Sequence, residues 1–266
     1  MSTRRLINAI TTSRQGRPLN KVFLTDVMTA IEKYDRLNSH KPSEWYKPSS
    51  LNCLRQMYFM RTKTDVDEAV TEYNSIGMAD TGTRRHVAIQ TVLERMEDMG
   101  YDWRYIDVEK YINMKHNQGK CLSLNVVGKN GAETKLFDNI YKVMFLCDGI
   151  VQKISTGEYY LFEFKNQISF KANGKESVDK EHYNQVTAYC AELDLDKAFV
   201  LYENRDNCSL ECPELFRVSQ EMKDNFFNRL LECEGYVERL ILPPKISDTK
   251  HCKWCKYKTA CRKGGN

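Results

Sequence analysis

The sequence predicts an α/β protein, and three neighbouring features indicate that class. Residues 141–153 and 158–166 are apolar stretches joined by the turn-like segment ISTG, which is typical of a β-hairpin. Residues 176–193 show helical spacing and are followed by an apolar strand pattern at 197–204. Strand, helix and strand in this order indicate a βαβ unit. We therefore expect a sheet with helices packed on it.

Helical spacing predicts further helices on both sides of this region. Residues 22–34 and 80–99 have apolar positions at helical intervals, and Gly100 ends the second helix. Residues 219–241 form a long amphipathic helix with Ser219 as N-cap. Between them, residues 101–142 contain β-prone pieces without a clear pairing.

The motifs described below divide the chain into three segments. We expect a helical N-terminal segment at 1–79, a core domain at 80–218, and a C-terminal helix with a cysteine-rich tail at 219–266.

Composition indicates a folded protein of a reducing compartment. The chain has 266 residues, of which 41% are hydrophobic, and it has neither a membrane-spanning apolar stretch nor a secretory signal pattern. We therefore expect a cytoplasmic protein with no membrane partner. Its ten cysteines are then better interpreted as including metal or cluster ligands than as a disulfide framework.

Charge is distributed unevenly along the chain. Residues 1–62 hold eleven basic against four acidic residues (+7), and 250–266 hold six against none (+6), so a net +4 leaves 4 − 13 = −9 for 63–249. An acidic middle between basic ends suits an enzyme that binds metal ions centrally and a polyanion peripherally. Solvated surface charge is the alternative interpretation.

The hairpin register places two carboxylates together. If ISTG forms the turn, Lys153 pairs with Glu158, and counting back along both strands places Asp148 opposite Glu163. Because side chains alternate along a strand, Lys165 lies on the same face as Glu163.

Such a cluster favours hydrolysis of phosphodiesters. Buried carboxylates repel each other unless a cation lies between them, and Mg²⁺ or Mn²⁺ prefers oxygen ligands. A neighbouring lysine can orient or help deprotonate a water molecule while the metal stabilises charge on a phosphate. A cross-strand Lys–Glu pair, with Asp148 in a turn, is the alternative. No phosphate-binding GxxxxGK[ST] loop is present, so an ATP-driven motor would be a separate protein.

Three further residues are weaker candidates when taken singly. His86 lies on the apolar face of the helix at 80–99, where a histidine is most often an ordinary core residue. Gln185 and Tyr189 are four apart and share a helix face, which suits packing as well as a site.

The basic C-terminal tail contains a cysteine motif. Cys252, Cys255 and Cys261 have the spacing C-x2-C-x5-C, which requires a fourth ligand elsewhere. In the same tail, lysines alternate with aromatic residues, as suits backbone contacts and base stacking on single-stranded DNA: Lys250, Lys253, Trp254, Lys256, Tyr257 and Lys258. A solubilising basic terminus is the alternative. We interpret the other cysteines as core or surface residues.

Taken together, these residues resemble a known family. The ordered motifs resemble those of RecB-type nucleases of the PD-(D/E)XK superfamily, in the order Gly82-x3-His86, Asp148-Gly-Ile, Glu163-Phe-Lys165 and Gln185-x3-Tyr189. Leu146 and Cys147 before Asp148 depart from the usual aspartate motif. The resemblance implies a restriction-endonuclease-like core, in which a mixed central sheet is flanked by helices.

The cysteines resemble those of the iron-sulfur subgroup, which includes the CRISPR-associated exonuclease and AddAB-type nuclease domains. The resemblance implies that Cys53, in the motif C-x-R-x-x-Y with Arg55 and Tyr58, is the fourth ligand of a [4Fe-4S] cluster. The cluster would join the N- and C-terminal segments. Four thiolates also suit zinc, so the ligand types alone leave both metals open.

The resemblance implies a role for each candidate residue. His86, Asp148, Glu163 and the carbonyl of Phe164 would bind Mg²⁺ or Mn²⁺, Lys165 would assist water, and Gln185 and Tyr189 would position DNA or the lysine. Arg55 and Tyr58 would join the tail in binding DNA.

We therefore expect an exonuclease acting on single-stranded DNA or DNA ends, in recombination, repair, replication or CRISPR adaptation. A helicase, an annealing protein or a CRISPR integrase would be its partner. An iron-sulfur DNA-binding scaffold with a degenerate site and a structure-specific endonuclease are the alternatives.

Overall fold

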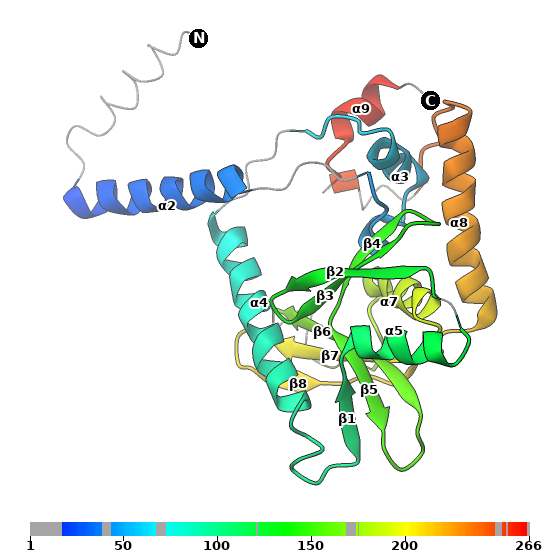
Figure 1. Ribbon diagram of the computed structural model, residues 1–266. Helices are drawn as coiled ribbons and strands as arrows, with labels where there is room; N and C mark the ends of the chain where they lie inside the picture. The colour runs from blue at the N-terminus through cyan, green and yellow to red at the C-terminus, as the bar shows by residue number, and fades with distance from the viewer. Residues whose placement is uncertain are drawn as a thin grey trace. The chain divides into compact units, whose positions relative to one another are not determined.

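The computed structural model describes most of the chain, namely residues 18–38, 44–67, 73–120, 122–168, 174, 176–247, 252–253 and 255–264 (Figure 1). The chain divides into two compact units, and the division falls within helix α4 (Tyr73–Leu93), between Thr81 and Gly82. The first unit contains helix α2 (Leu19–Asn38). The second unit comprises Pro42–Asp67 and Gly82–Asn266, so Cys53 lies in the same unit as the predicted core.

The second unit contains two sheets and the helices around them. Before α4 it contains the helices η1 (Pro48–Ser50) and α3 (Leu54–Arg61). After α4 it contains α5 (Val108–Asn117), α7 (Lys180–Glu192), α8 (Gln220–Glu238) and α9 (Lys258–Lys263). Its strands are β1 (Trp103–Ile106), β2 (Leu124–Asn130), β3 (Glu133–Asp138), β4 (Val143–Cys147), β5 (Gly149–Lys153), β6 (Tyr159–Gln167), β7 (Lys197–Asn204), β8 (Leu210–Glu211) and β9 (Phe216–Arg217).

The larger sheet is mixed, as predicted. In the described residues it has six strands in the order β1-β5-β6-β7-β8, and β9 also pairs with β7. Strands β5 and β6 are antiparallel, whereas β6 and β7 are parallel and joined through α7. The hairpin and the βαβ unit are therefore both confirmed. The smaller sheet has the order β2-β3-β4.

Two segments differ from the sequence prediction. Residues 141–153 are not one strand, because the chain breaks at Asp148 and places β4 in the small sheet and β5 in the large one. The reason is Gly149, whose φ of +154° turns the chain out of an ordinary strand. Helix α5 was not predicted, although Asp107 caps it by accepting the backbone N–H of Glu109 at 3.0 Å.

The predicted helices are present with shifted ends. Residues 22–34 lie inside α2, and the helix expected at 80–99 runs from 73 to 93, followed by turns up to Gly100. In α8 the N-cap prediction is confirmed, since Ser219 Oγ accepts the backbone N–H of Met222 at 3.2 Å. No helix of the described residues is both long and apolar enough to span a bilayer.

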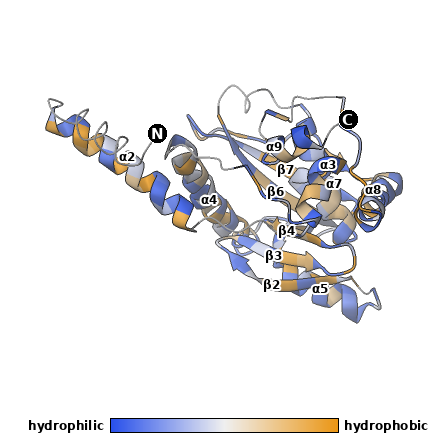
Figure 2. Cartoon of the chain, turned by 90° about the horizontal axis from the view of Figure 1, so that it is seen from above, coloured by the Kyte–Doolittle hydropathy of each residue, from blue (hydrophilic) through white to orange (hydrophobic). Residues whose placement is uncertain are grey.

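Helices cover both faces of the large sheet. On one face α7 packs on β6 and β7, and α8 and α3 pack outside α7 (Figures 1 and 2). On the other face Ile89 and Leu93 of α4 pack against a cluster that includes Phe162 and Phe164 of β6. Because alternate β6 residues face opposite sides, Glu163 and Lys165 point toward α7. The sheet is thus buried on both faces where the candidate residues lie.

Candidate active site

Asp148 lies where the two sheets meet. It follows β4 and precedes β5, and its side chain is 5% exposed. The hydroxyl of Tyr105 donates to the Asp148 carbonyl at 3.1 Å, and Gln90 of α4 donates in turn to that hydroxyl at 2.9 Å. A Cβ on residue 149 would lie 2.3 Å from Tyr105 Cε2, so glycine is required for this approach. The backbone of Asp148 is therefore held from two directions.

The carboxylate of Asp148 is also fixed at both oxygens. Its Oδ1 lies 2.9 Å from Nδ1 of His86, and its Oδ2 accepts the backbone N–H of Phe164 at 2.7 Å. The His86 ring packs edge-on against the Phe164 ring, with centroids 4.9 Å apart. His86 therefore faces inward to the sheet, as predicted from its position on the helix.

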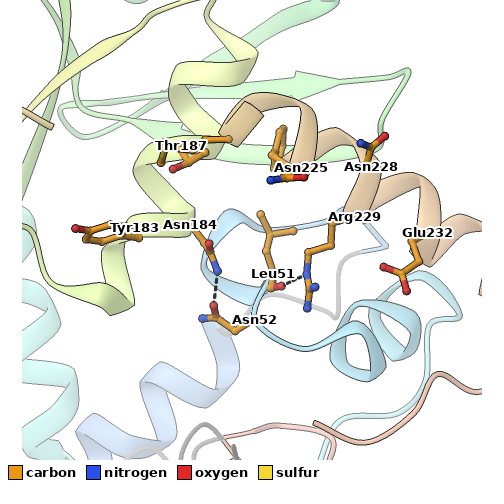
Figure 3. A pocket seen from close by; sticks show the side chains of 11 residues that line it. Leu51, Asn52, Tyr183, Asn184, Thr187, Asn225, Asn228, Arg229 and Glu232 are labelled. Carbon is orange, nitrogen blue, oxygen red and sulfur yellow. Dashed lines mark hydrogen bonds between the residues drawn. The ribbon is translucent and has the colours of Figure 1, made fainter. Parts of the chain in front are cut away.

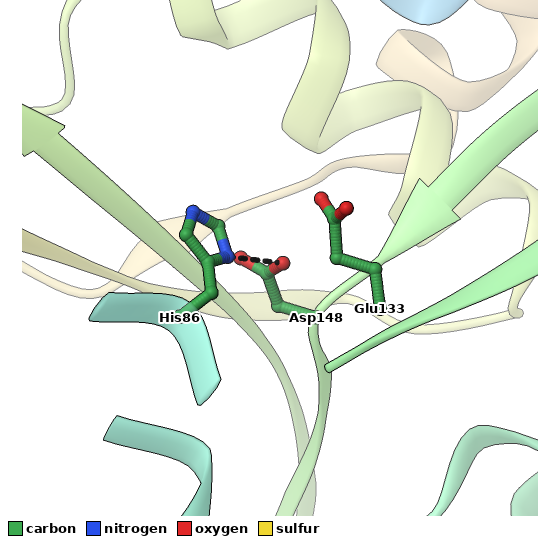
Figure 4. A group of neighbouring side chains, drawn as sticks. All are labelled: His86, Glu133 and Asp148. Carbon is green, nitrogen blue, oxygen red and sulfur yellow. Dashed lines mark hydrogen bonds and ion pairs between the residues drawn. The ribbon is translucent and has the colours of Figure 1, made fainter. Parts of the chain in front are cut away.

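Glu133 completes a group of three that could hold a metal ion. Ligand atoms of His86, Glu133 and Asp148 all lie within 4.8 Å of one another (Figure 4). Sequence reasoning missed Glu133, which begins β3. The sequence signal that could have identified it is the β3–β4 hairpin around the turn after Asp138. Pairing these two strands places Glu133 beside Asp148.

Glu163 and Lys165 form the second half of the site with two residues of α7. The Lys165 ammonium donates to Glu163 Oε1 at 2.6 Å and to Gln185 Oε1 at 3.1 Å. The Gln185 amide nitrogen lies 2.9 Å from both Glu163 Oε1 and the Tyr189 hydroxyl. Gln185 and Tyr189 thus face the candidate site and orient the carboxylate and the lysine.

Burial controls the protonation of these groups. Burial raises the pKa of Glu163 to about 7, even though the charge of Lys165 opposes the shift. Burial lowers the pKa of Lys165, but the adjacent Glu163 carboxylate outweighs it and the pKa is raised overall. For His86, burial is likewise outweighed by the hydrogen bond to Asp148, so its pKa is raised. Lys165 is therefore a cation at neutral pH.

The site contains a carboxylate oxygen that is available to bind a cation. Glu163 Oε2 is buried and has no hydrogen-bond partner within the described part of the chain. A buried carboxylate oxygen without a donor is costly unless a proton or a cation binds it. Carboxylate oxygens and an imidazole are ligands that Mg²⁺ and Mn²⁺ accept. The predicted contribution of the Phe164 carbonyl stays a prediction, whereas its N–H binds Asp148.

A second polar network holds α4 on the sheet beside His86. The Arg85 guanidinium pairs with both oxygens of Glu203 in β7, whose side chain is 1% exposed. Asn166, directly after Lys165, also donates to Glu203 at 2.8 Å. Sequence reasoning did not identify this network. It links the helix that carries His86 to the strand that carries Lys165.

The four predicted ligand cysteines line one cavity. Cys53, Cys252, Cys255 and Cys261 surround a space of about 400 Å³, together with the cations Arg55, Lys245, Lys253, Lys258 and Arg262. Among the described residues, these cysteines do not form a group that could hold a metal ion as they stand. The structure thus brings the cysteines to one cavity without forming a compact cluster of sulfurs.

Protein contacts alone also join the segments that carry these cysteines. Arg55 is 2% exposed and donates to the carbonyls of Pro243 at 2.7 Å and Cys261 at 3.2 Å. The Asp67 backbone N–H donates to the carbonyl of Lys256 at 2.7 Å. The rings of Phe59 and Tyr257 pack with centroids 5.7 Å apart. Residues 53–67 therefore hold the C-terminal segment.

The predicted DNA-contacting residues lie in different settings. Lys253 and Lys256 are exposed, whereas Arg55 and Tyr257 are buried, and Tyr58 and Lys258 are partly buried. The guanidinium of Arg55 donates its hydrogen bonds to carbonyl groups of the C-terminal segment. Lys250 and Trp254 lie outside the described residues.

Comparison with known proteins finds a similar solved structure but no match to a family model or a curated protein. No protein-family model matches the sequence, and no curated protein matches it either. The fold is similar to a solved structure described as the crystal structure of SSO0001. The TM-score is 0.44 at 15% sequence identity, and the alignment covers 92% of this chain and 98% of that one.

Proposed function

We propose that this chain is a metal-dependent deoxyribonuclease of the PD-(D/E)XK type, and that it acts as an exonuclease on single-stranded DNA or DNA ends. The observation that carries the proposal is that Asp148, which belongs to the group of His86, Glu133 and Asp148, is hydrogen-bonded to β6, the strand that carries the Glu163–Lys165 pair. Buried carboxylates, an imidazole and a lysine are the groups that metal-assisted phosphodiester hydrolysis needs.

His86, Glu133, Asp148 and Glu163 would hold Mg²⁺ or Mn²⁺. When bound, the ion supplies Lewis-acid stabilisation of negative charge on the phosphate. Asp148 enters the site with its carboxylate fixed by His86 and the Phe164 N–H, so little reorganisation is needed. The partnerless oxygen of Glu163 is available to a ligand.

Lys165 is best suited to an electrostatic role. Its ammonium donates hydrogen bonds to Glu163 Oε1 at 2.6 Å and to Gln185 Oε1 at 3.1 Å, so it is held as a donor toward oxygen atoms. It can orient a water molecule and stabilise charge that develops on phosphate oxygens. Gln185 fixes the ammonium at 3.1 Å and Tyr189 fixes Gln185, so both are positioning residues.

The cysteine cavity supports a bound [4Fe-4S] cluster. In a tetrahedral zinc site, Zn–S bonds of about 2.3 Å hold the thiolates roughly 3.8 Å apart. A four-iron cluster spaces its thiolates more widely, because each one binds a different iron. The four cysteines line one cavity, and the flanking cations offset thiolate charge. Zinc is the alternative, because four cysteine thiolates can also bind a zinc ion.

Two other functions use the same features. A structure-specific endonuclease would use the same metal chemistry on a different DNA shape. An iron-sulfur DNA-binding scaffold would keep the cysteine site and lack cleavage; the complete lysine and carboxylate set disfavours it. For any of the three, we propose a separate helicase, annealing protein or CRISPR integrase as partner, as the resemblance to AddAB-type and CRISPR-associated nucleases implies.

The decisive experiment compares linear and circular DNA. Anaerobically purified protein is incubated with Mn²⁺ or Mg²⁺ and end-labelled single-stranded, double-stranded and circular DNA, and with RNA of the same sequence. Degradation of linear DNA alone, abolished by EDTA, supports the exonuclease. Cleavage of circular DNA supports the endonuclease instead. No cleavage of any substrate by folded, metal-loaded protein contradicts a nuclease function.

The cofactor is tested separately on the same preparation. A molar ratio of iron to acid-labile sulfide near one, together with a broad absorption band in the violet-to-blue region, supports the cluster. Stoichiometric zinc without sulfide would overturn it.

A further inference from the structure

One cavity of the second unit is lined by none of the candidate metal ligands and by none of the cysteines. It has a volume of about 650 Å³ and opens between α7, α8 and the segment that precedes Cys53 (Figure 3). This volume lies within the range of about 300–1,000 Å³ that is typical of ligand sites. Nothing in the proposed cleavage chemistry uses it.

The lining offers paired donors and acceptors with no net charge. Asn225 and Asn228 of α8 present amides that have no partner among the described residues (Figure 3). Arg229 uses its Nε to donate to the Leu51 carbonyl at 2.5 Å, and Glu232 lies one turn further along the helix. One guanidinium and one carboxylate offset each other, so the cavity suits an uncharged hydrogen-bonding group.

Thr187 shows that the floor of the cavity is polar. This residue is 6% exposed and lines the cavity. A threonine hydroxyl can both donate a hydrogen bond to a ligand and accept one from it. The walls beside it are apolar, with Leu51 and Phe226 3% and 6% exposed.

An exposed aromatic ring stands at the side of the cavity. Tyr183 is 38% exposed and lines the space one turn before Thr187 on α7. A flat ring next to amides is the arrangement by which proteins bind unstacked nucleobases, with stacking on the ring and hydrogen bonds to the base edge. Apolar walls also suit the faces of a base. An extended peptide would use the amides but would not need the exposed ring.

We propose that this cavity binds a nucleobase of the single-stranded nucleic acid on which the enzyme acts. The inference rests on the proposed nuclease function. Its position supports it, because Asn184 precedes the site residue Gln185 and hydrogen-bonds to Asn52, which precedes Cys53. One strand bound here would therefore lie between the cysteine cavity and the helix that carries Gln185.

The test measures binding without cleavage. A fluorescein-labelled 12-nucleotide single strand of mixed sequence is titrated with protein in EDTA, and fluorescence anisotropy gives the Kd. Thr187→Val keeps the side-chain shape and Asn225→Leu removes one amide. Each is expected to raise the Kd about three- to tenfold. Gln220→Leu is the matched control, because it makes the same kind of change on α8 outside the cavity, and its Kd should equal that of the wild type.

Two further measurements distinguish base recognition from other contacts. An abasic strand should bind more weakly to the wild type, and Thr187→Val should not weaken it further. A strand with 5-iododeoxyuridine should cross-link to the peptide that contains Tyr183. Three results would each overturn the proposal. The first is a Kd unchanged in both cavity variants, and the second is a Thr187→Val substitution that raises the Kd for the abasic strand as much as for the intact strand. The third is cross-linking only to peptides outside α7 and α8.

The outcome is separable from that of the proposed function. If wild-type protein cleaves DNA but the cavity variants bind as tightly as the wild type, the base site is wrong and the nuclease stands. If the wild type binds the strand at this cavity but does not cleave with Mn²⁺, the nuclease is wrong and the binding site stands. If it neither binds nor cleaves, both are wrong.

Discussion

Glu133 lies opposite Asp148 in the β3–β4 pair, since the register of Thr134 with Cys147 continues by one residue to this pair. In the β5–β6 hairpin, Gly149 pairs with Phe162, so the same counting places Asp148 opposite Glu163. Asp148 therefore lies between the ends of two strand pairs, and continuing each register by one residue brings a glutamate beside it. The break at Gly149 makes this arrangement possible.

Glu133 is the first residue to test as a metal ligand. Glu133→Gln keeps the size and removes the charge, so we expect Mn²⁺ affinity to fall by about tenfold or more. Isothermal titration calorimetry measures this directly. Glu109→Gln, an exposed change in the first turn of α5, is the control and should leave the affinity unchanged. Equal affinities for the wild type and Glu133→Gln would remove this residue from the site.

Gly149 should tolerate no side chain while Tyr105 is present. Gly149→Ala places a methyl group 2.3 Å from the Tyr105 ring at a φ of +154°, so we expect a loss of about 1–3 kcal/mol in the free energy of unfolding. Urea denaturation measures it. If the clash is the cause, Tyr105→Ala should reduce the cost of the second change in a double-mutant cycle. Additive losses would point to the backbone conformation alone.

The Arg85–Glu203 pair should stabilise α4 on the sheet. Arg85→Met leaves the buried Glu203 carboxylate with Asn166 as its remaining side-chain donor among the described residues, and we expect a loss of about 2–3 kcal/mol in the free energy of unfolding. Thermal or urea unfolding checks this. Arg85→Met combined with Glu203→Gln should be less destabilised than Arg85→Met, because no charge is left buried. An equal or larger loss in the double variant would contradict the account.

Glu192 predicts a pH-dependent stability away from the metal site. Burial and the neighbouring Asp138 raise its pKa well above the ordinary value of 4.5, so the folded protein keeps this proton more firmly than the unfolded chain. Folding then takes up a proton, and this residue opposes stability increasingly as the pH rises above 4.5. Glu192→Gln should have a higher Tm than the wild type at pH 8 and nearly the same Tm at pH 4. A difference that does not depend on pH would contradict the assignment.

The sequence predicted the strand pairing that matters most for the site. The ISTG turn fixed the β5–β6 register, and Lys153 N–H does donate to the Glu158 carbonyl at 2.9 Å. Alternation along β6 then correctly placed Glu163 and Lys165 on one face, in contact with each other. These inferences succeeded because short hairpins are determined by local turn geometry.

Residues contributed by other elements were missed for a physical reason. Tyr105 and Gln90 reach Asp148 only because β1 and α4 pack beside it, and neither has a local sequence signal for that contact. Glu203 likewise reads as an ordinary strand residue until Arg85 is placed over it. Tertiary packing determines such partners. The cysteine cavity is similar, since Cys53 is remote in sequence from Cys252, and a family resemblance was needed to associate them.

The most direct test of the central claim is the rate of DNA cleavage by Lys165→Met with its Mn²⁺ affinity measured on the same sample. Removing the ammonium leaves the carboxylates in place, so we predict Mn²⁺ affinity equal to or higher than that of the wild type, and cleavage of linear single-stranded DNA at least about 100-fold slower. Cleavage by Lys165→Met at the wild-type rate would contradict the account, as would a wild-type protein that binds Mn²⁺ and leaves DNA intact.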